Sequence, residues 1–179
     1  MFFRKKIKIF LPIVFITLTG LTWAKDNDQK KAQHYNEIGW LKIKEKHYQE
    51  AEKYLLQAIS LNPKVKFYYN NYAVACLNQG KNQEALSYLK ICVALDPYYA
   101  KAFFNMALAY FYLFEFKKAY QAYQKTVEVD KVYAKQRFKI PKAIDKVEKV
   151  YQQHPENKAL KIILDSMKSE FIFKKNLEN

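Results

Sequence analysis

Residues 96–107 read DPYYAKAFFNMA, and residues 62–73, which lie 34 positions earlier, read NPKVKFYYNNYA. Each segment opens with asparagine or aspartate followed by proline, and each ends with alanine. The residue before a proline is disfavoured in the helical region, so each of these pairs is expected to end one helix. Two equivalent helix ends at a fixed separation indicate a repeated helical unit.

The 34-residue period continues on both sides of these segments. Small residues recur at two positions of each unit, and bulky residues recur at others. The columns are Pro63 and Pro97; Gly39, Ala73 and Ala107; Ala51, Ala85 and Ala119; Leu61, Leu95 and Val129; Tyr35, Tyr69 and Phe103; and Leu55, Leu89 and Tyr123. Six columns in one register predict three copies of a two-helix unit.

Each column has a physical reason. Two antiparallel helices need small residues where their backbones come closest, and large residues one turn away fill the gap to the next pair. Polar residues separate the helices of a pair, and Gly80 suits a left-handed helix cap. The expected helices span residues 32–45, 48–61, 66–79, 82–95, 100–113 and 116–129.

This pattern closely resembles the tetratricopeptide-repeat (TPR) family, from Ala32 to about Tyr133. The resemblance implies an all-α fold, a right-handed α-solenoid of three TPR helix-turn-helix repeats (32–65, 66–99 and 100–133) followed by C-terminal capping helices. Two positions depart from the family pattern. Lys42 stands where a large residue is usual, and Lys131 replaces the proline that would close the third repeat. The second departure predicts that the last helix pair is joined differently to the C-terminal segment.

The repeat register breaks from Ala134 onward, because Pro141 falls where a small helical residue is required. Pro141 fits the first turn of one helix, and Pro155 the start of another. Their expected apolar stripes are Ile144, Val147 and Val150, then Leu160, Ile163, Leu164, Met167 and Phe171. We expect residues 134–179 to cap the open end of the stack. The alternative is a helix that binds a partner or a membrane surface through residues 171–175.

Residues 1–24 are typical of a secretory signal peptide. Basic residues within 4–8 precede a charge-free run at 9–23, which is shorter than the ~20 apolar residues of a membrane span. Thr22 and Ala24 are small residues that suit cleavage after Ala24. An uncleaved anchor is the alternative, and it would be the chain's contact with a membrane. Both alternatives export the rest of the chain. The style of the signal and the lysine-, tyrosine- and asparagine-rich composition favour a bacterium, and we therefore expect the protein in the periplasm or cell envelope.

The composition favours a helical binding protein over an enzyme. Half of the residues are hydrophobic, with only three glycines and five prolines, which argues for helices joined by few turns. His34, His47 and His154 have no metal-ligand spacing, and no phosphate-binding loop or nucleophile elbow occurs. We therefore expect no catalysis, no metal and no cofactor. The net charge of +14 is spread along the chain, so no nucleic-acid partner is expected.

The candidate binding site is the inner face of the stack, which the first helix of each repeat is expected to line. It is apolar and aromatic, with a few amides that can pair with an extended backbone. Its expected residues are Asn36, Trp40, Ile43, Phe67, Asn70, Asn71, Val74, Leu77, Lys101, Phe104, Asn105, Leu108, Phe111 and Tyr112. Such a face can take a peptide, an amphipathic helix or the chain's own tail.

One TPR subset clamps the carboxylate of a chaperone tail with lysine, asparagine and arginine. Asn71 and Lys101 match that pattern. Asn36 and Trp40 replace its first lysine and asparagine, and Asn105 replaces its arginine. The clamp is therefore incomplete, and the resemblance does not favour an acidic carboxyl-terminal ligand.

The sequence thus predicts an exported scaffold that binds another protein in the concave groove. The alternative is a self-assembling structural protein that forms homo-oligomers through the solenoid ends or the tail helix. Cys76 and Cys92 fall in the two helices of the second repeat, and small buried thiols are the expectation. Export leaves a disulfide open as the alternative.

Overall fold

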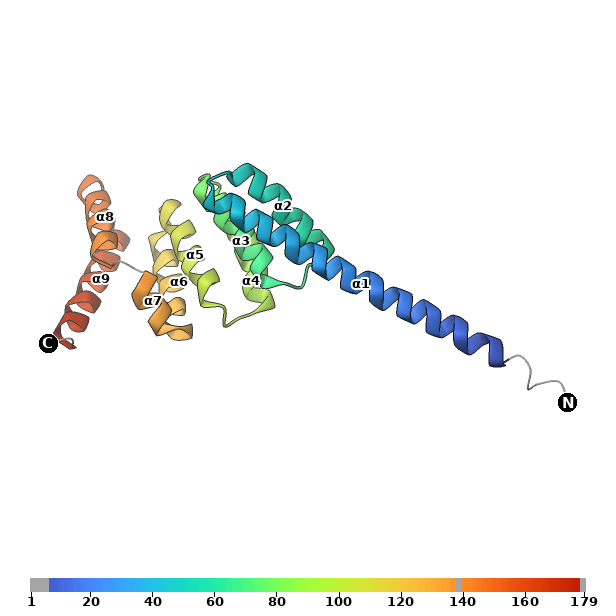
Figure 1. Cartoon of the computed structure of the whole chain (residues 1–179). Helices are drawn as coiled ribbons and strands as arrows, with labels where there is room; N and C mark the ends of the chain where they lie inside the picture. The colour runs from blue at the N-terminus through green and yellow to red at the C-terminus, as the bar shows by residue number, and fades with distance from the viewer. Residues whose placement is uncertain (1–6, 138–139, 178–179) are drawn as a thin grey trace.

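The computed structural model describes the backbone of residues 7–137 and 140–177, and the side chains of residues 25–137 and 144–169. The helices in this part of the chain are α1 (Ile7–Lys44), α2 (Tyr48–Leu61), α3 (Lys66–Asn78), α4 (Asn82–Leu95), α5 (Ala100–Tyr112), α6 (Phe116–Val129), α7 (Lys131–Arg137), α8 (Ile140–Gln153) and α9 (Lys158–Leu177). Helices α1–α6 form three stacked pairs, and α8 and α9 lie at the end opposite to the N-terminus (Figure 1). The predicted α-solenoid with capping helices is confirmed.

The helix ends in the repeats coincide with the residues that were expected to end them. Asn62 and Asp96 lie directly after α2 and α4, and both have left the helical conformation, with φ of −145° and −147°. Asp130 closes α6 with nearly the same conformation, φ −151°, although Lys131 rather than proline is the next residue. Without the proline, α7 begins at once. This agrees with the prediction, made from Lys131, that the last helix pair is joined differently to the C-terminal segment.

Helix α1 begins far upstream of the first repeat. The sequence predicted a helix from residue 32, but α1 is continuous from Ile7, so that boundary is wrong. Residues 25–31 contain neither proline nor glycine, and nothing in them ends a helix. The side chains of the predicted signal peptide, residues 1–24, lie outside the described residues. In the part of the chain that the structure describes, no helix has both the length and the apolar character needed to cross a bilayer.

Small residues sit where the paired helices touch. A Cβ atom added to Gly39 of α1 would lie 2.6 Å from Leu55 Cγ and 3.3 Å from the carbonyl oxygen of Ala51, both on α2. Ala51 and Leu55 are fully buried, as are Ala85 and Leu89 at the equivalent positions of the second repeat. The missing side chain at Gly39 thus lets Leu55 of α2 pack directly on the backbone of α1.

The turn between the two helices of each repeat contains one residue with positive φ. These residues are Lys46 (65°), Gly80 (76°) and Phe114 (59°), spaced by the repeat period. Each donates its backbone N–H to the carbonyl of the residue three positions earlier, at 3.0–3.1 Å. The turn therefore keeps one conformation in all three repeats, and only the second repeat has the glycine that adopts it without strain.

Substitutions at this position should change stability in opposite directions. Gly80→Ala should lower the free energy of unfolding by about 1 kcal/mol, because an L-residue is strained in the left-handed region. Nothing lies within 4 Å of a Cβ built there, so the cost comes from the backbone alone. Lys46→Gly should raise the free energy of unfolding by about 0.5 kcal/mol, since the relief of backbone strain exceeds the entropic cost of glycine. Urea denaturation followed by circular dichroism measures both, and a stabilising Gly80→Ala would contradict this account.

The repeat register extends slightly further than the sequence indicated. Tyr133 and Ala134 lie one period after Tyr99 and Ala100, and Ala134 is buried as Ala100 is. Helix α7 contacts α5 and α6, so it occupies the place of a fourth repeat's first helix but ends after seven residues. The break is therefore at the end of α7 rather than at Ala134.

Helices α8 and α9 cap the third repeat. Their buried side chains form one cluster with Phe116 of α6, against which Phe111 of α5 packs. The cluster contains Ile144, Val147, Leu160, Ile163 and Leu164, with Val150, Tyr151 and Met167 at its edge. The predicted stripes of both tail helices thus meet here, except for Phe171 and the 171–175 segment, whose side chains lie outside the described residues.

Candidate functional site

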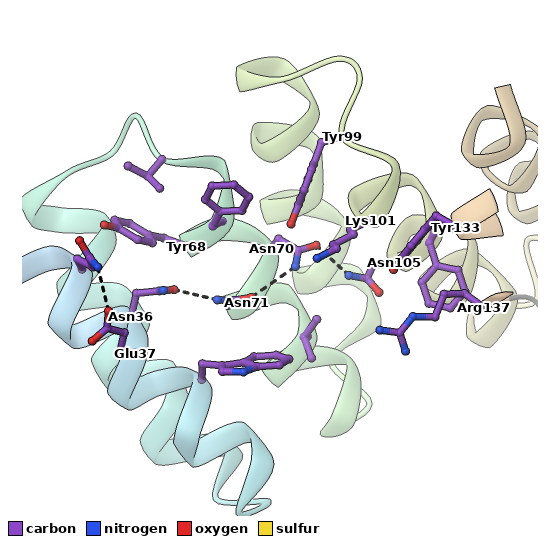
Figure 2. Close-up of a pocket in the computed structure, with 16 residues that line it drawn as sticks. Asn36, Glu37, Tyr68, Asn70, Asn71, Tyr99, Lys101, Asn105, Tyr133 and Arg137 are labelled. Carbon is purple, nitrogen blue, oxygen red and sulfur yellow. Dashed lines mark hydrogen bonds between the residues drawn. The ribbon is translucent and has the colours of Figure 1, made fainter. Parts of the chain in front are cut away.

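A cavity of about 790 Å³ lies on the inner face of the stack (Figure 2). Its walls come from α1, α3, α5 and α7, which are the first helices of successive repeats, and from the residues just before α3 and α5. We call it the groove. Its lining residues are Gln33, Asn36, Glu37, Trp40, Val65, Phe67, Tyr68, Asn70, Asn71, Val74, Tyr99, Lys101, Phe104, Asn105, Tyr133 and Arg137.

Four asparagines form a chain of hydrogen bonds along the groove, which we call the asparagine ladder. Asn71 Nδ2 donates to Asn36 Oδ1 at 2.9 Å, and Asn70 Nδ2 donates to Asn71 Oδ1 at 3.5 Å. Asn105 Nδ2 donates to Asn70 Oδ1 at 2.9 Å. The ladder connects α1, α3 and α5, as the dashed lines of Figure 2 show. It therefore joins the inner helices of all three repeats.

The ladder is a product of the repeat period. Asn36 and Asn70 occupy one column, and Asn71 and Asn105 occupy the next. Asn70 is 6% exposed and Asn105 8% exposed, so their amides need internal partners, which the ladder supplies. Among the described residues, no hydrogen bond engages Asn36 Nδ2 or Asn105 Oδ1. The two ends of the ladder thus present one donor and one acceptor to a ligand.

Aromatic side chains border the ladder. Trp40 and Phe67 remain 41% and 48% exposed, which is unusual for side chains of this size in a packed helical stack. Phe67 packs edge-to-face on Tyr99, with 5.5 Å between ring centroids, and Phe104 packs in the same way on Tyr133 at 5.9 Å. The groove therefore combines apolar contact surface with amide hydrogen-bonding groups.

Charges are unevenly distributed around the groove. Lys66, next to it, is paired with Asp96 and lies over the rings of Phe67 and Tyr99, so its charge is used within the fold. The hydrogen bond from Lys66 is the main reason why the pKa of Asp96 lies below its usual value. Lys101 and Arg137 line the groove at its α5 and α7 end.

The structure brings nine of the fourteen predicted groove residues together in the groove. These are Asn36, Trp40, Phe67, Asn70, Asn71, Val74, Lys101, Phe104 and Asn105. Asn71, which matches the carboxylate clamp, is bound on both sides within the ladder. Its amide is therefore already engaged by the protein.

The other five predicted residues lie outside the lining. Ile43 is buried in the main core, and Leu77 packs against that core. Phe111 packs on the tail cluster and Tyr112 lies beside it, with 6.1 Å between their ring centroids. Leu108 is half-buried and does not line the groove. These five side chains therefore do not contribute to the lining of the groove.

Seven lining residues were missed: Gln33, Glu37, Val65, Tyr68, Tyr99, Tyr133 and Arg137. Val65, Tyr99 and Tyr133 form one column of the repeat. The period of this column could have indicated that the three residues share a position in the groove. Arg137 had no such signal, because the repeat pattern was expected to stop before it.

The described residues offer no site for metal chemistry, since no three His, Cys, Asp or Glu side chains converge among them. Cys76 and Cys92 are free and buried. Their thiols donate to Glu52 Oε1 at 3.4 Å and to the carbonyl of Lys66 at 3.3 Å. Burial raises both pKa values, that of Cys92 to about 12. Both thiols therefore stay protonated and unreactive at neutral pH.

Stacked helix pairs with a binding groove on the inner face define a class of protein, the helical-repeat solenoids. The tetratricopeptide repeat family model matches residues 32–65, 68–99 and 100–133, which is more than half of the 179 residues. The chain belongs to the tetratricopeptide-repeat family. None of the curated proteins is similar enough to match it.

Solved structures of similar fold include the second TPR domain of Spaghetti (RPAP3) bound to the HSP90 peptide SRMEEVD. It is 25% identical, with a TM-score of 0.58, over 60% of this chain and 98% of that one. The Arabidopsis OM64 TPR domain is 20% identical, with a TM-score of 0.58, over 80% of this chain and 98% of that one. MamA is 22% identical, with a TM-score of 0.54, over 62% of this chain and 61% of that one. The last two show the fold alone.

Proposed function

We propose that this protein is an exported scaffold that holds an extended segment of another protein in its groove, in the bacterial cell envelope. The observation that carries the proposal is the asparagine ladder bordered by half-exposed aromatic rings. Trp40 and Phe67 leave apolar ring surface open to contact with a ligand. In the part of the chain that the structure describes, α8 and α9 pack on the third repeat and not on the groove.

The amide groups suit a peptide ligand. The donor at the Asn36 end of the ladder and the acceptor at the Asn105 end can pair with the backbone of an extended chain, which holds it without reading its side chains. The Spaghetti domain, solved with a bound HSP90 peptide, gives one example of a TPR domain that binds a peptide. A binding role also accounts for the absence of catalytic motifs in the sequence.

Removing aromatic rings from the groove should abolish capture of the partner. Trp40→Ala with Phe67→Ala should reduce the partner recovered by cross-linking from envelope fractions by about tenfold or more, because two exposed apolar contacts are lost. The fold should remain, since both rings are already about half in solvent. Circular dichroism checks this.

The matched control is Tyr98→Ala with Phe114→Ala, which removes two aromatic rings that are 80% and 69% exposed outside the groove. This variant should capture the partner at the wild-type level. Equal capture by the groove variant would place the binding site elsewhere. Recovery of the partner from cytoplasmic rather than envelope fractions would contradict export, as would an intact amino terminus on protein that stays in the cytoplasm.

Self-assembly is the second candidate, and one observation favours it. Leu41 is 52% exposed, whereas Ala75 and Ala109 in the same column are fully buried. No repeat precedes the first among the described residues, so this end of the stack leaves an apolar side chain in water. The other end is covered by α8 and α9, which prevents end-to-end stacking of copies. Light scattering separates the candidates, since a stable monomer at micromolar concentration excludes assembly.

A further inference from the structure

Three short segments, directly after α2, α4 and α6, lie along one edge of the stack, which we call the loop edge. Figure 1 shows this edge on the side opposite to the turns within the repeats. Each segment has two exposed residues, and the residue after them lines the groove, as Val65, Tyr99 or Tyr133. The exposed pairs keep the repeat period and are Pro63 and Lys64, Pro97 and Tyr98, and Lys131 and Val132.

The loop edge exposes apolar side chains. Tyr98 is 80% exposed, which is the highest value among the large hydrophobic side chains of the described residues, and Val132 is 67% exposed. Leu95, the last residue of α4, is 41% exposed beside them. A tyrosine combines an apolar ring with a polar hydroxyl, which suits the boundary between water and a lipid bilayer.

The loop edge also carries unpaired lysines. Among the described residues, no carboxylate forms an ion pair with Lys64 or Lys131. Of the two aspartates at this edge, Asp96 is paired with Lys66, and Asp130 accepts a backbone N–H of α7 at 2.8 Å. The whole chain has a net charge of +14, which attracts it to an anionic surface.

Helix α1 leaves the stack at the loop edge. Ala32 of α1 is buried with Ala58 of α2 and Tyr68 of α3, and Leu61 and Val65 pack against the same cluster. The part of α1 before Ala32 therefore extends beyond this edge, and Figure 1 shows it running toward the side where the three segments lie. In a chain that keeps residues 1–24 in a membrane, the loop edge is thus the part of the stack that faces this membrane.

We infer that the loop edge lies on the surface of an anionic phospholipid bilayer, in addition to any contact made by residues 1–24. The exposed apolar side chains enter the headgroup region, and Lys64 and Lys131 pair with lipid phosphates. Binding at such an interface depends on buried apolar area together with electrostatic attraction to anionic lipids, and this edge supplies both. The contact does not depend on the partner of the groove, but it places one end of the groove beside the membrane.

The test attaches an environment-sensitive fluorophore to Val132→Cys in the full chain. Cys76 and Cys92 are buried, so the reagent labels the new thiol. Vesicles of phosphatidylcholine with phosphatidylglycerol should increase the fluorescence and shift it to the blue, and a lipid-attached quencher should reduce it. Vesicles of phosphatidylcholine alone should have a smaller effect, and added salt should reverse the response. Attachment through residues 1–24 alone leaves the surroundings of this probe unchanged.

Neutralising the two lysines tests the electrostatic part of the contact. Lys64→Gln with Lys131→Gln should lower the ratio of docked to undocked edge about thirtyfold, which is about fivefold for each lysine. The matched control is Lys53→Gln with Lys90→Gln, which removes the same charge from exposed positions of α2 and α4. This control should leave the docking of the edge unchanged.

Phe114→Cys carries the control probe, because Phe114 is as exposed as Val132 but lies in a turn at the opposite edge. Its fluorescence should stay that of a solvated probe. A Val132 probe that responds no more than the Phe114 probe, or equally to both kinds of vesicle, would overturn the inference. Equal effects of the two lysine pairs would also overturn it. If circular dichroism shows that labelled Val132→Cys is misfolded, Tyr98→Cys provides a second probe position on the same edge.

Discussion

Gly39→Val should destabilise the protein by about 2–3 kcal/mol, which is the upper part of the usual cost of overpacking a filled core, about 1–3 kcal/mol. The new Cβ would lie 2.6 Å from Leu55 Cγ and 2.9 Å from its Cδ2, and Leu55 is fully buried. Leu55→Ala alone should cost about 3 kcal/mol through the cavity that it leaves. Urea denaturation of each variant measures these free energies.

The double variant tests whether these two residues touch as described. Leu55→Ala makes room for the valine methyl groups. The free energy of unfolding that the double variant loses should therefore be smaller than the sum of the two single losses, by at least about 1 kcal/mol. Ala94→Val is the control, because Ala94 is an exposed position of α4 and valine there should cost only about 0.5 kcal/mol. Additive losses, or a Gly39→Val loss as small as that of Ala94→Val, would contradict the close packing of α1 on α2.

Ending the chain after Arg137 should destabilise the three repeats themselves. The deletion removes α8 and α9 and exposes Phe116, whose burial contributes about 2–3 kcal/mol. For a chain of this size, a loss of that order lowers the melting temperature by about 4–12 °C. Thermal unfolding followed by circular dichroism measures the change.

Point variants on α9 separate capping from a general effect of truncation. Leu160 is 1% exposed, so Leu160→Ala should lower the free energy of unfolding by about 3 kcal/mol. Ile162 on the same helix is 66% exposed, and Ile162→Ala should cost less than about 0.5 kcal/mol. A truncated protein that keeps its stability and binds its partner more tightly would show instead that the tail inhibits the groove.

The positions of the repeat helices could be predicted because short-range signals end them. The prolines after Asn62 and Asp96 and the small-residue columns depend only on local geometry. The start of α1 could not be predicted in the same way, since residues 25–31 contain no signal that ends a helix. The same difficulty applied to α7, which begins directly after Asp130 without a proline.

Part of the groove lining could be predicted from the repeat period. The amide columns at Asn36 and Asn71 were assigned to the inner face, where the structure places them. Ile43 and Leu77 share one column and both pack against the core, because the helices turn their last residues inward. Phe111 packs against α8 and α9, which are distant from it in sequence. Helical period alone cannot supply contacts of that kind.

Helix α1 is one continuous helix that runs from the upstream end of the chain to the groove wall. In a chain that keeps residues 1–24, Trp40 in the groove wall is carried on the same unbroken helix as Ile7, about 50 Å away along the helix axis. A rotation or a pull applied at the upstream end therefore acts directly on that wall, without a flexible joint to absorb it. Whatever holds the far end of this rod also sets the direction in which the groove faces.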